Sequence, residues 1–227
     1  MSAPIRLSQF LPYVLPGAPG APDIVAEKYV RLAAIEFCER TRCWRHITQI
    51  DIDEDRTVGM AAPFYAAIHE IEYATFSQGA EDKRDLIPTQ YSDIAKLPDA
   101  NFAREGMPRY VTQSSPNTVT IYPLTPGTLE ISLFLKPRMG QDFQPGEPDD
   151  PIQDTFNLAP EFLLTQFGSA IACGALAQML MQPQTRWHDP QKALYYQQKF
   201  DEACDRQFSR NMRGQQRAPR RTRFRFL

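Results

Sequence analysis

The chain has 227 residues, of which 42% are hydrophobic and 23% charged, a composition typical of globular rather than disordered proteins. This length can bury a sizeable core in one large domain or two small ones. We see no apolar run that approaches the about 18 residues needed to span a bilayer, and residues 1–10 lack the regions of a secretory signal. We therefore expect a protein that is made and used in a cytosol-like compartment, without a membrane.

The formal net charge of −2 is unevenly distributed along the chain. Residues 206–227 contain eight arginines and no acidic residue, so the other 205 residues carry 17 basic and 27 acidic side chains, a net charge of −10. An acidic body with a basic tail is suited to reaching a partner.

The first predicted elements are an arm and a helix. Residues 1–22 are rich in proline and glycine, which predicts an extended N-terminal arm. Asp23 has the side chain of a helix N-cap, and the apolar spacing after it predicts a helix to about Trp44.

Residues 46–150 favour a β-rich domain of short strands and long loops. Alternating apolar residues predict strands over 47–52 and 67–75. Two β-rich runs, Thr118–Tyr122 and Thr128–Phe134, flank the turn residues Thr125-Pro126-Gly127, which predicts a β-hairpin. Residues 91–97 favour a helical turn, and residues 137–155 are typical of a linker.

Two further helices are predicted in the C-terminal part. Pro160 suits the first turn of a helix that ends near Met181, and its two glycines are costly unless they allow helices to approach closely. Asp189-Pro190 is a start signal for a last helix that ends near Gly214. Trp187 suits a core and an interface position equally well. The predicted helix-packing residues are Gly168, Gly174, Trp187, Tyr196 and Phe200.

Taken in chain order, these elements predict an α+β protein. A helical bundle of one N-terminal and two C-terminal helices would comprise residues 23–45 and 151–213. The β-rich domain, residues 46–150, would be inserted into it, and residues 1–22 and 214–227 would form extended terminal arms.

No catalytic motif is recognisable, and we expect no enzymatic activity, no catalytic residue, no metal and no cofactor. No nucleophile elbow, phosphate-binding loop or metalloprotease motif is present. Residues 51–62 begin like a calcium loop, but Arg56 and Ala62 stand where that loop needs glycine and glutamate. The four cysteines lack zinc-site spacing, so we expect buried, reduced thiols at Cys38, Cys43, Cys173 and Cys204.

The C-terminal tail interleaves arginine with phenylalanine. It is compatible with a disordered, solubilising end, with a phosphate-neutralising arm on nucleic acid, and with an arm that folds on an acidic partner. Residues 223–227 alternate with period two, as a strand added to a partner does. The candidate binding residues of this arm are Arg213, Arg217, Arg220, Arg221, Arg223, Phe224, Arg225, Phe226 and Leu227.

Four segments resemble the head-to-tail adaptor (connector) proteins of tailed bacteriophages, especially short-tailed ones. They are Leu32–Arg40 with Trp44-Arg45; Gly106–Tyr110; Val119–Pro123 with the strand that ends at Lys136-Pro137; and Gly174–Leu180 followed by Trp187, Pro190, Ala193, Tyr196 and Phe200. In order, they cover most of the chain between residues 11 and 205, whereas residues 51–105 and the arginine-rich tail contribute nothing to this resemblance.

The resemblance implies a structural virion protein at the head–tail junction, assembled in the host cytoplasm. Such adaptors form a ring, dodecameric in related connectors, that binds under the portal protein and receives the tail tube or nozzle protein on its opposite face. For this chain it implies that the arm from about Met212 to Leu227 binds the portal, that the bundle makes subunit contacts, and that the β-domain faces the tail. Genomic DNA would pass through the channel without sequence-specific contact.

Two alternatives belong to other functional classes. A nucleic-acid-binding protein would use the arginine-rich tail, and its binding would depend strongly on salt. An enzyme with an unrecognised site, such as a tail-associated wall hydrolase, would show activity against cell wall.

Overall fold

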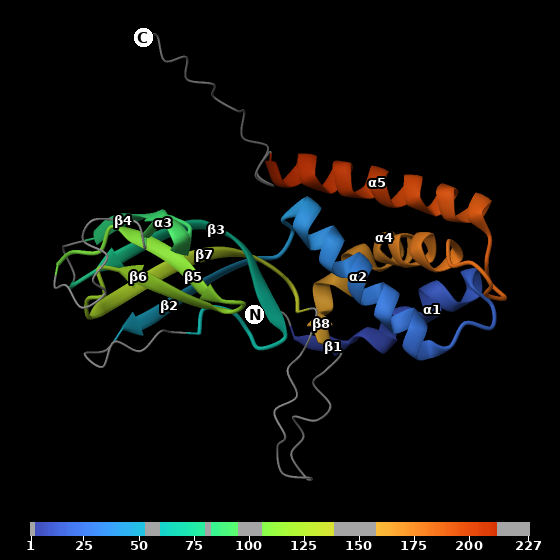
Figure 1. Ribbon diagram of the computed structural model, residues 1–227, viewed down its shortest axis with the longest axis horizontal. Helices are drawn as coiled ribbons and strands as arrows, with labels where there is room; N and C mark the ends of the chain where they lie inside the picture. Colours follow the sequence, from blue (N-terminus) through green and yellow to red (C-terminus); the bar gives the residue numbers. More distant parts are fainter. Residues whose placement is uncertain (1–2, 53–59, 80–82, 95–105, 139–157, 213–227) are drawn as a thin grey trace, which may run out of the picture. The chain divides into compact units, whose positions relative to one another are not determined.

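The computed structural model describes residues 3–52, 60–79, 83–94, 106–138 and 158–212 (Figure 1). The chain divides into two compact units: Met1–Cys43 with Pro160–Leu227, and Trp44–Ala159. The first contains the long helices and the second contains a β-sheet, so the predicted α+β class is confirmed.

Three long helices dominate the first unit: α2 (Asp23–Thr41), α4 (Glu161–Leu180) and α5 (Pro190–Met212). α4 packs against both α2 and α5 (Figure 1). Small buried residues such as Ala172, Ala175 and Ala177 leave room for these two neighbours.

α4 is, by length and composition alone, long and apolar enough to cross a membrane, so the expectation that no such segment exists is wrong. However, 56% of its apolar window is buried inside the unit, as in the core helix of a folded domain. The apolar character of α4 is explained by its packing against α2 and α5.

The N-terminal residues fold as part of the helical unit, and the prediction of an extended arm is wrong for residues 7–17, which form helical turns. Four short elements follow one another: β1 (Pro4–Arg6), η1 (Leu7–Phe10), α1 (Leu11–Val14) and η2 (Leu15–Gly17). The prolines in α1 and η2 stand at the first positions of each helix, which tolerate proline. Leu7, Phe10 and Val14 are fully buried, and burying each such side chain contributes about 1.5–3 kcal/mol.

The helix boundaries follow local chemistry closely. The backbone N–H of Lys192 donates to the Asp189 carboxylate at 3.1 Å, which confirms the predicted start of α5. Asp23 is instead the first residue of α2, because Pro22 takes the extended cap conformation. α2 ends three residues early, where Arg42 adopts a left-handed conformation.

The second unit is a curled six-stranded sheet with the order β2-β7-β3-β4-β5-β6. Its strands are β2 (Arg45–Ile52), β3 (Ala66–Ser77), β4 (Lys83–Pro88), β5 (Tyr110–Ser115), β6 (Thr118–Tyr122) and β7 (Gly127–Pro137). The helical turn α3 (Tyr91–Ile94) follows β4, and the short strand β8 (Leu158–Pro160) precedes α4. The core of this sheet includes Ile131, Leu133 and Leu135 of β7, all fully buried.

The predicted hairpin between residues 118–122 and 128–134 is wrong. β7 lies between β2 and β3, so both of its edges are occupied, and β6 pairs with β5 around Pro116-Asn117. β7 forms an eight-residue ladder with β2 and a longer, bulged one with β3, far more pairing than the five residues of β6 offer.

Candidate protein-binding surface

The predicted portal-binding arm lies outside the described residues. α5 is described to Met212, and the candidate residues follow it: Arg213, Arg217, Arg220, Arg221, Arg223, Phe224, Arg225, Phe226 and Leu227.

Two of the predicted helix-packing residues lie against each other. A Cβ atom at Gly174 would stand 2.8 Å from two ring carbons of Phe200 and 3.0 Å from the Cβ of Ala33. Glycine at this position thus allows α4 to approach α5 and α2. At Gly168 the same atom would have ordinary contacts, 3.5 Å to Leu164 and 3.8 Å to Tyr13.

The other two predicted packing residues are half-buried. Trp187 lies in the loop between α4 and α5, and its buried indole nitrogen has no hydrogen-bond partner among the residues that the structure describes. The Tyr196 ring contacts that of Tyr195 edge to face, with centroids 5.5 Å apart.

An arginine on α2 fixes the position of α5. The Arg40 guanidinium donates to Asp201 at 2.5 Å and to Glu36 at 3.4 Å, and it lies 3.8 Å from Asp205. It also stands 5.7 Å from the centre of the buried Phe200 ring. The hydrogen bond from Arg40 lowers the pKa of the Asp201 carboxyl, although burial opposes this.

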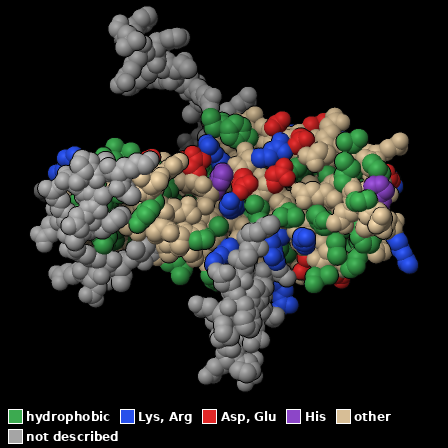
Figure 2. All heavy atoms as spheres, viewed as in Figure 1, with side chains coloured by type: hydrophobic (Ala, Val, Ile, Leu, Met, Phe, Trp, Pro, Cys, Tyr) green, Lys and Arg blue, Asp and Glu red, His purple; other side chains and the backbone are tan. Residues whose placement is uncertain are grey.

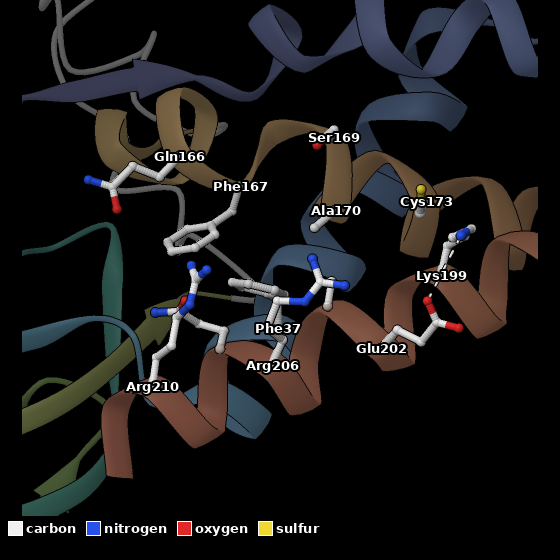
Figure 3. A pocket seen from close by; sticks show the side chains of 12 residues that line it. Phe37, Gln166, Phe167, Ser169, Ala170, Cys173, Lys199, Glu202, Arg206 and Arg210 are labelled. Atoms are coloured by element: carbon white, nitrogen blue, oxygen red, sulfur yellow. Dashed lines mark ion pairs between the residues drawn. The ribbon is translucent and has the colours of Figure 1, made fainter. Parts of the chain in front are cut away.

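A groove of about 380 Å³ runs between α4 and α5, with a side chain of α2 at its base (Figure 3). We call it the α4–α5 groove. Figure 3 shows Arg206 and Arg210 extending from α5 towards α4, with the rings of Phe37 and Phe167 nearby. Its lining residues are Phe37, Gln166, Phe167, Ser169, Ala170, Cys173, Lys199, Glu202, Ala203, Arg206, Gln207 and Arg210.

The groove combines an apolar base with a cationic edge. Phe37 is buried and its ring lies 5.0 Å from that of Phe167. Three cations and one carboxylate, Glu202, line the edge, and Lys199 pairs with Glu202 at 3.9 Å. Within the described ranges, neither Arg206 nor Arg210 has an ion-pair partner, and both side chains are exposed. The groove can therefore bind carboxylates beside an apolar side chain.

A half-buried thiol, Cys173, also lines the groove. Burial raises its pKa, while the nearby Lys199 ammonium acts in the opposite direction. By contrast, Cys38 and Cys204 are buried, as expected for all four cysteines, and Cys43 is only partly buried.

Arg206 and Arg210 belong to the basic run of residues 206–227 and to the predicted last helix, and no groove was predicted beside them. Their spacing of four residues within a predicted helix places both on one helix face, and this signal could have separated them from the tail. The apolar base needs α2, α4 and α5 side by side, which no local pattern reveals.

The second unit has a more open depression of about 790 Å³, lined by residues of β3, of β5 and of the segment from the end of β4 to the start of α3. His69, Glu70, Tyr91, Thr112 and Ser114 are among its lining residues. In the parts of the chain that the structure describes, no group of three His, Cys, Asp or Glu residues could hold a metal ion.

On the face shown in Figure 2, small charged and apolar areas of the described residues are intermixed. No curated protein matches the sequence. The model of the SU10 adaptor protein family matches residues 8–223, which is nearly the whole chain. The chain therefore belongs to the SU10 adaptor protein family.

Proposed function

We propose that this phage adaptor-type protein is a structural virion component that forms a ring between the portal and the tail of a tailed phage. Its membership of the SU10 adaptor protein family over residues 8–223 carries the proposal. The protein would be made in the host cytoplasm and end at the head–tail junction, without enzymatic activity and without a cofactor. Its function would consist of binding itself, the portal protein and the tail tube or nozzle protein.

Exposed apolar side chains on the first unit support self-association. Leu194 and Tyr195 on α5, Ile24 on α2 and Tyr13 on α1 are each more than half exposed. These side chains lie outside the core of the unit and are available for contact with a neighbouring subunit. A heterologous contact repeated around a closed ring, which is dodecameric in related connectors, adds many modest contacts together.

The basic arm, residues 213–227, supports portal binding. It carries six arginines, two phenylalanines and no acidic residue. Arginine and aromatic residues are common anchors at protein interfaces. A ring would present many such arms to one portal, so each arm could bind weakly while the assembly binds tightly.

The charge of the body supports passage of DNA without retention. Residues 1–205 carry a net charge of −10, which repels phosphate. The alternative, a nucleic-acid-binding protein, would instead bind DNA through the tail with a steep dependence on salt.

The test is to mix the full chain with the portal protein of the same phage, and to follow the mixture by gel filtration and negative-stain imaging. We expect rings on the portal with the full chain. A variant that lacks residues 213–227 should keep its circular dichroism spectrum and melting temperature but lose portal binding. A control in which the six arm arginines become lysine preserves the charge and should lose only part of the affinity.

Two outcomes would contradict the proposal. If the full chain does not bind the portal, the adaptor ring is refuted. If the truncated chain binds as well as the full one, the arm is not the portal-binding element. Tight DNA binding by the isolated protein, abolished by the truncation, would favour the alternative.

A further inference from the structure

We propose that the α4–α5 groove binds the acidic segment, residues 141–156, of a second copy of this chain. This inference rests on the proposed function, because it supplies one contact between neighbouring subunits of the ring. The groove is complete in one copy, and the partner contributes the peptide that fills it.

The groove has the chemistry of a peptide-binding site for carboxylates. Lys199, Arg206 and Arg210 outnumber Glu202 on its edge, which gives a net charge of +2. Its base is formed by Phe37, Phe167 and Ala170. A volume of about 380 Å³ lies at the low end of the range for ligand pockets, about 300–1,000 Å³, and suits an anchoring side chain rather than a folded element.

The segment 141–156 has the complementary composition. It contains five acidic residues and no basic one: Asp142, Glu147, Asp149, Asp150 and Asp154. It also contains Phe143, Ile152 and Phe156, which are suited to the apolar base. The segment itself lies outside the described residues.

The C-terminal arm, residues 213–227, is excluded by its charge as the occupant of the groove. The arm 213–227 carries six arginines, so it would be repelled by Arg206 and Arg210. The groove and the arm therefore serve different partners.

A second copy is favoured by the symmetry of a ring. In a closed ring each interface is heterologous: one subunit supplies a surface and its neighbour supplies a different, complementary one. A cationic groove and an acidic segment on the same chain form such a pair. Every copy can then bind its neighbour in one direction around the ring.

Cys173 provides a natural probe of groove occupancy. It lines the groove and is half-buried, whereas Cys43 belongs to no part of the groove and is also partly buried. The rate of alkylation at Cys173, measured by peptide mass spectrometry with Cys43 as internal reference, reports whether the groove is covered.

The first experiment adds a synthetic peptide of residues 141–156 to the dilute full chain. We expect Cys173 to react about tenfold more slowly at a peptide concentration ten times the Kd, because about one groove in eleven is then free. A peptide with its acids changed to Asn or Gln, and the arm peptide 213–227, should leave the rate unchanged. Slowing by the neutral peptide as well, or none by the acidic one, would refute the proposal.

The second experiment exchanges charges between two full-length variants. Arg206→Glu with Arg210→Glu should weaken self-association at least about tenfold, and so should Asp149→Lys with Asp150→Lys, because each turns attraction into repulsion. A 1:1 mixture of the two variants should restore association. The control is Lys28→Glu with Arg186→Glu. It changes the charge of the first unit by the same amount as the double arginine variant, but away from the groove, and should have little effect on self-association.

The outcomes also separate this inference from the proposed ring. If rings form on the portal but the charge exchange does not restore association, the ring stands and the groove contact is refuted. If the peptide protects Cys173 but no variant binds the portal, the groove contact stands and the portal adaptor is refuted. If Asp149→Lys with Asp150→Lys exposes Cys173 equally at every dilution, the segment binds its own chain, and the second-copy proposal is wrong.

Discussion

The same substitution at two glycines of α4 should have opposite effects on stability. Glycine to alanine in a helix gains about 1 kcal/mol of helix propensity. At Gly168 the added methyl meets Leu164 and Tyr13 at 3.5–3.8 Å, which is ordinary contact. We therefore expect Gly168→Ala to stabilise the first unit by about 1 kcal/mol.

At Gly174 the added methyl would meet the Phe200 ring at 2.8 Å. That ring is 1% exposed, lies 6.2 Å from the Phe37 ring, and stands 5.7 Å from the Arg40 guanidinium, so it has little room to move. Overpacking of this kind costs about 1–3 kcal/mol, which exceeds the gain in propensity. Gly174→Ala should therefore destabilise the unit by up to about 2 kcal/mol.

Thermal and urea unfolding followed at 222 nm would measure both effects on the helical unit. A change of 1 kcal/mol corresponds to a shift of about 4 °C in Tm. Adding Phe200→Leu to Gly174→Ala removes the ring carbons that clash. In a double-mutant cycle, the two changes together should therefore cost less stability than the sum of the two single changes. If both alanine variants raise Tm, the close approach at Gly174 does not constrain the packing.

Three further predictions concern charge, thiols and capping. Arg40 lowers the pKa of Asp201, so the ion pair stabilises the fold above the ordinary carboxyl pKa and is lost as the pH falls through the lowered one. Asp201→Asn should thus cost less than about 1 kcal/mol at neutral pH, since the carboxylate is 43% exposed, and nothing in strong acid. Burial raises the pKa of Cys204 to about 12, so in the native protein it should resist alkylation at pH 8, while Cys43 reacts; mass spectrometry of both peptides checks this. Asp189→Ala should lose the bond to the backbone N–H of Lys192 and about 1 kcal/mol, whereas Asp189→Asn should keep most of it in urea unfolding.

The sequence predicted those features that depend on neighbouring residues. The start of α5 follows from an acid that caps a helix and a proline that begins it, and both act within one turn. The strands β2 and β3 were predicted in the same way, with boundaries shifted by one or two residues. The helical turn after β4 begins at Tyr91 as predicted and is described to Ile94, because residues 95–97 lie outside the described residues.

The failures involve competition between distant segments. Thr118–Tyr122 and Thr128–Phe134 have the local signals of a hairpin, but β2 and β3 take both edges of β7. The burial of Leu7, Phe10 and Val14 against the helices likewise outweighs the proline and glycine around them. Both results depend on partners in other elements, β2 and β3 for β7, and α2 and α4 for the N-terminal turns. The spacing of apolar residues within one segment carries no information about such partners.

The division of the arginines between α5 and the arm has a consequence for experiments on assembly. The eight arginines from residue 206 onwards form one basic run in the sequence, yet Arg206 and Arg210 belong to a helix that ends at Met212 and line the α4–α5 groove. A truncation before residue 206 would remove two groove cations together with the arm, and would also cut the helix that carries Gln207 against the core. Only a truncation after Met212 separates the two surfaces. If the groove binds a neighbouring subunit and the arm binds the portal, this truncation should abolish portal binding while the peptide 141–156 still protects Cys173.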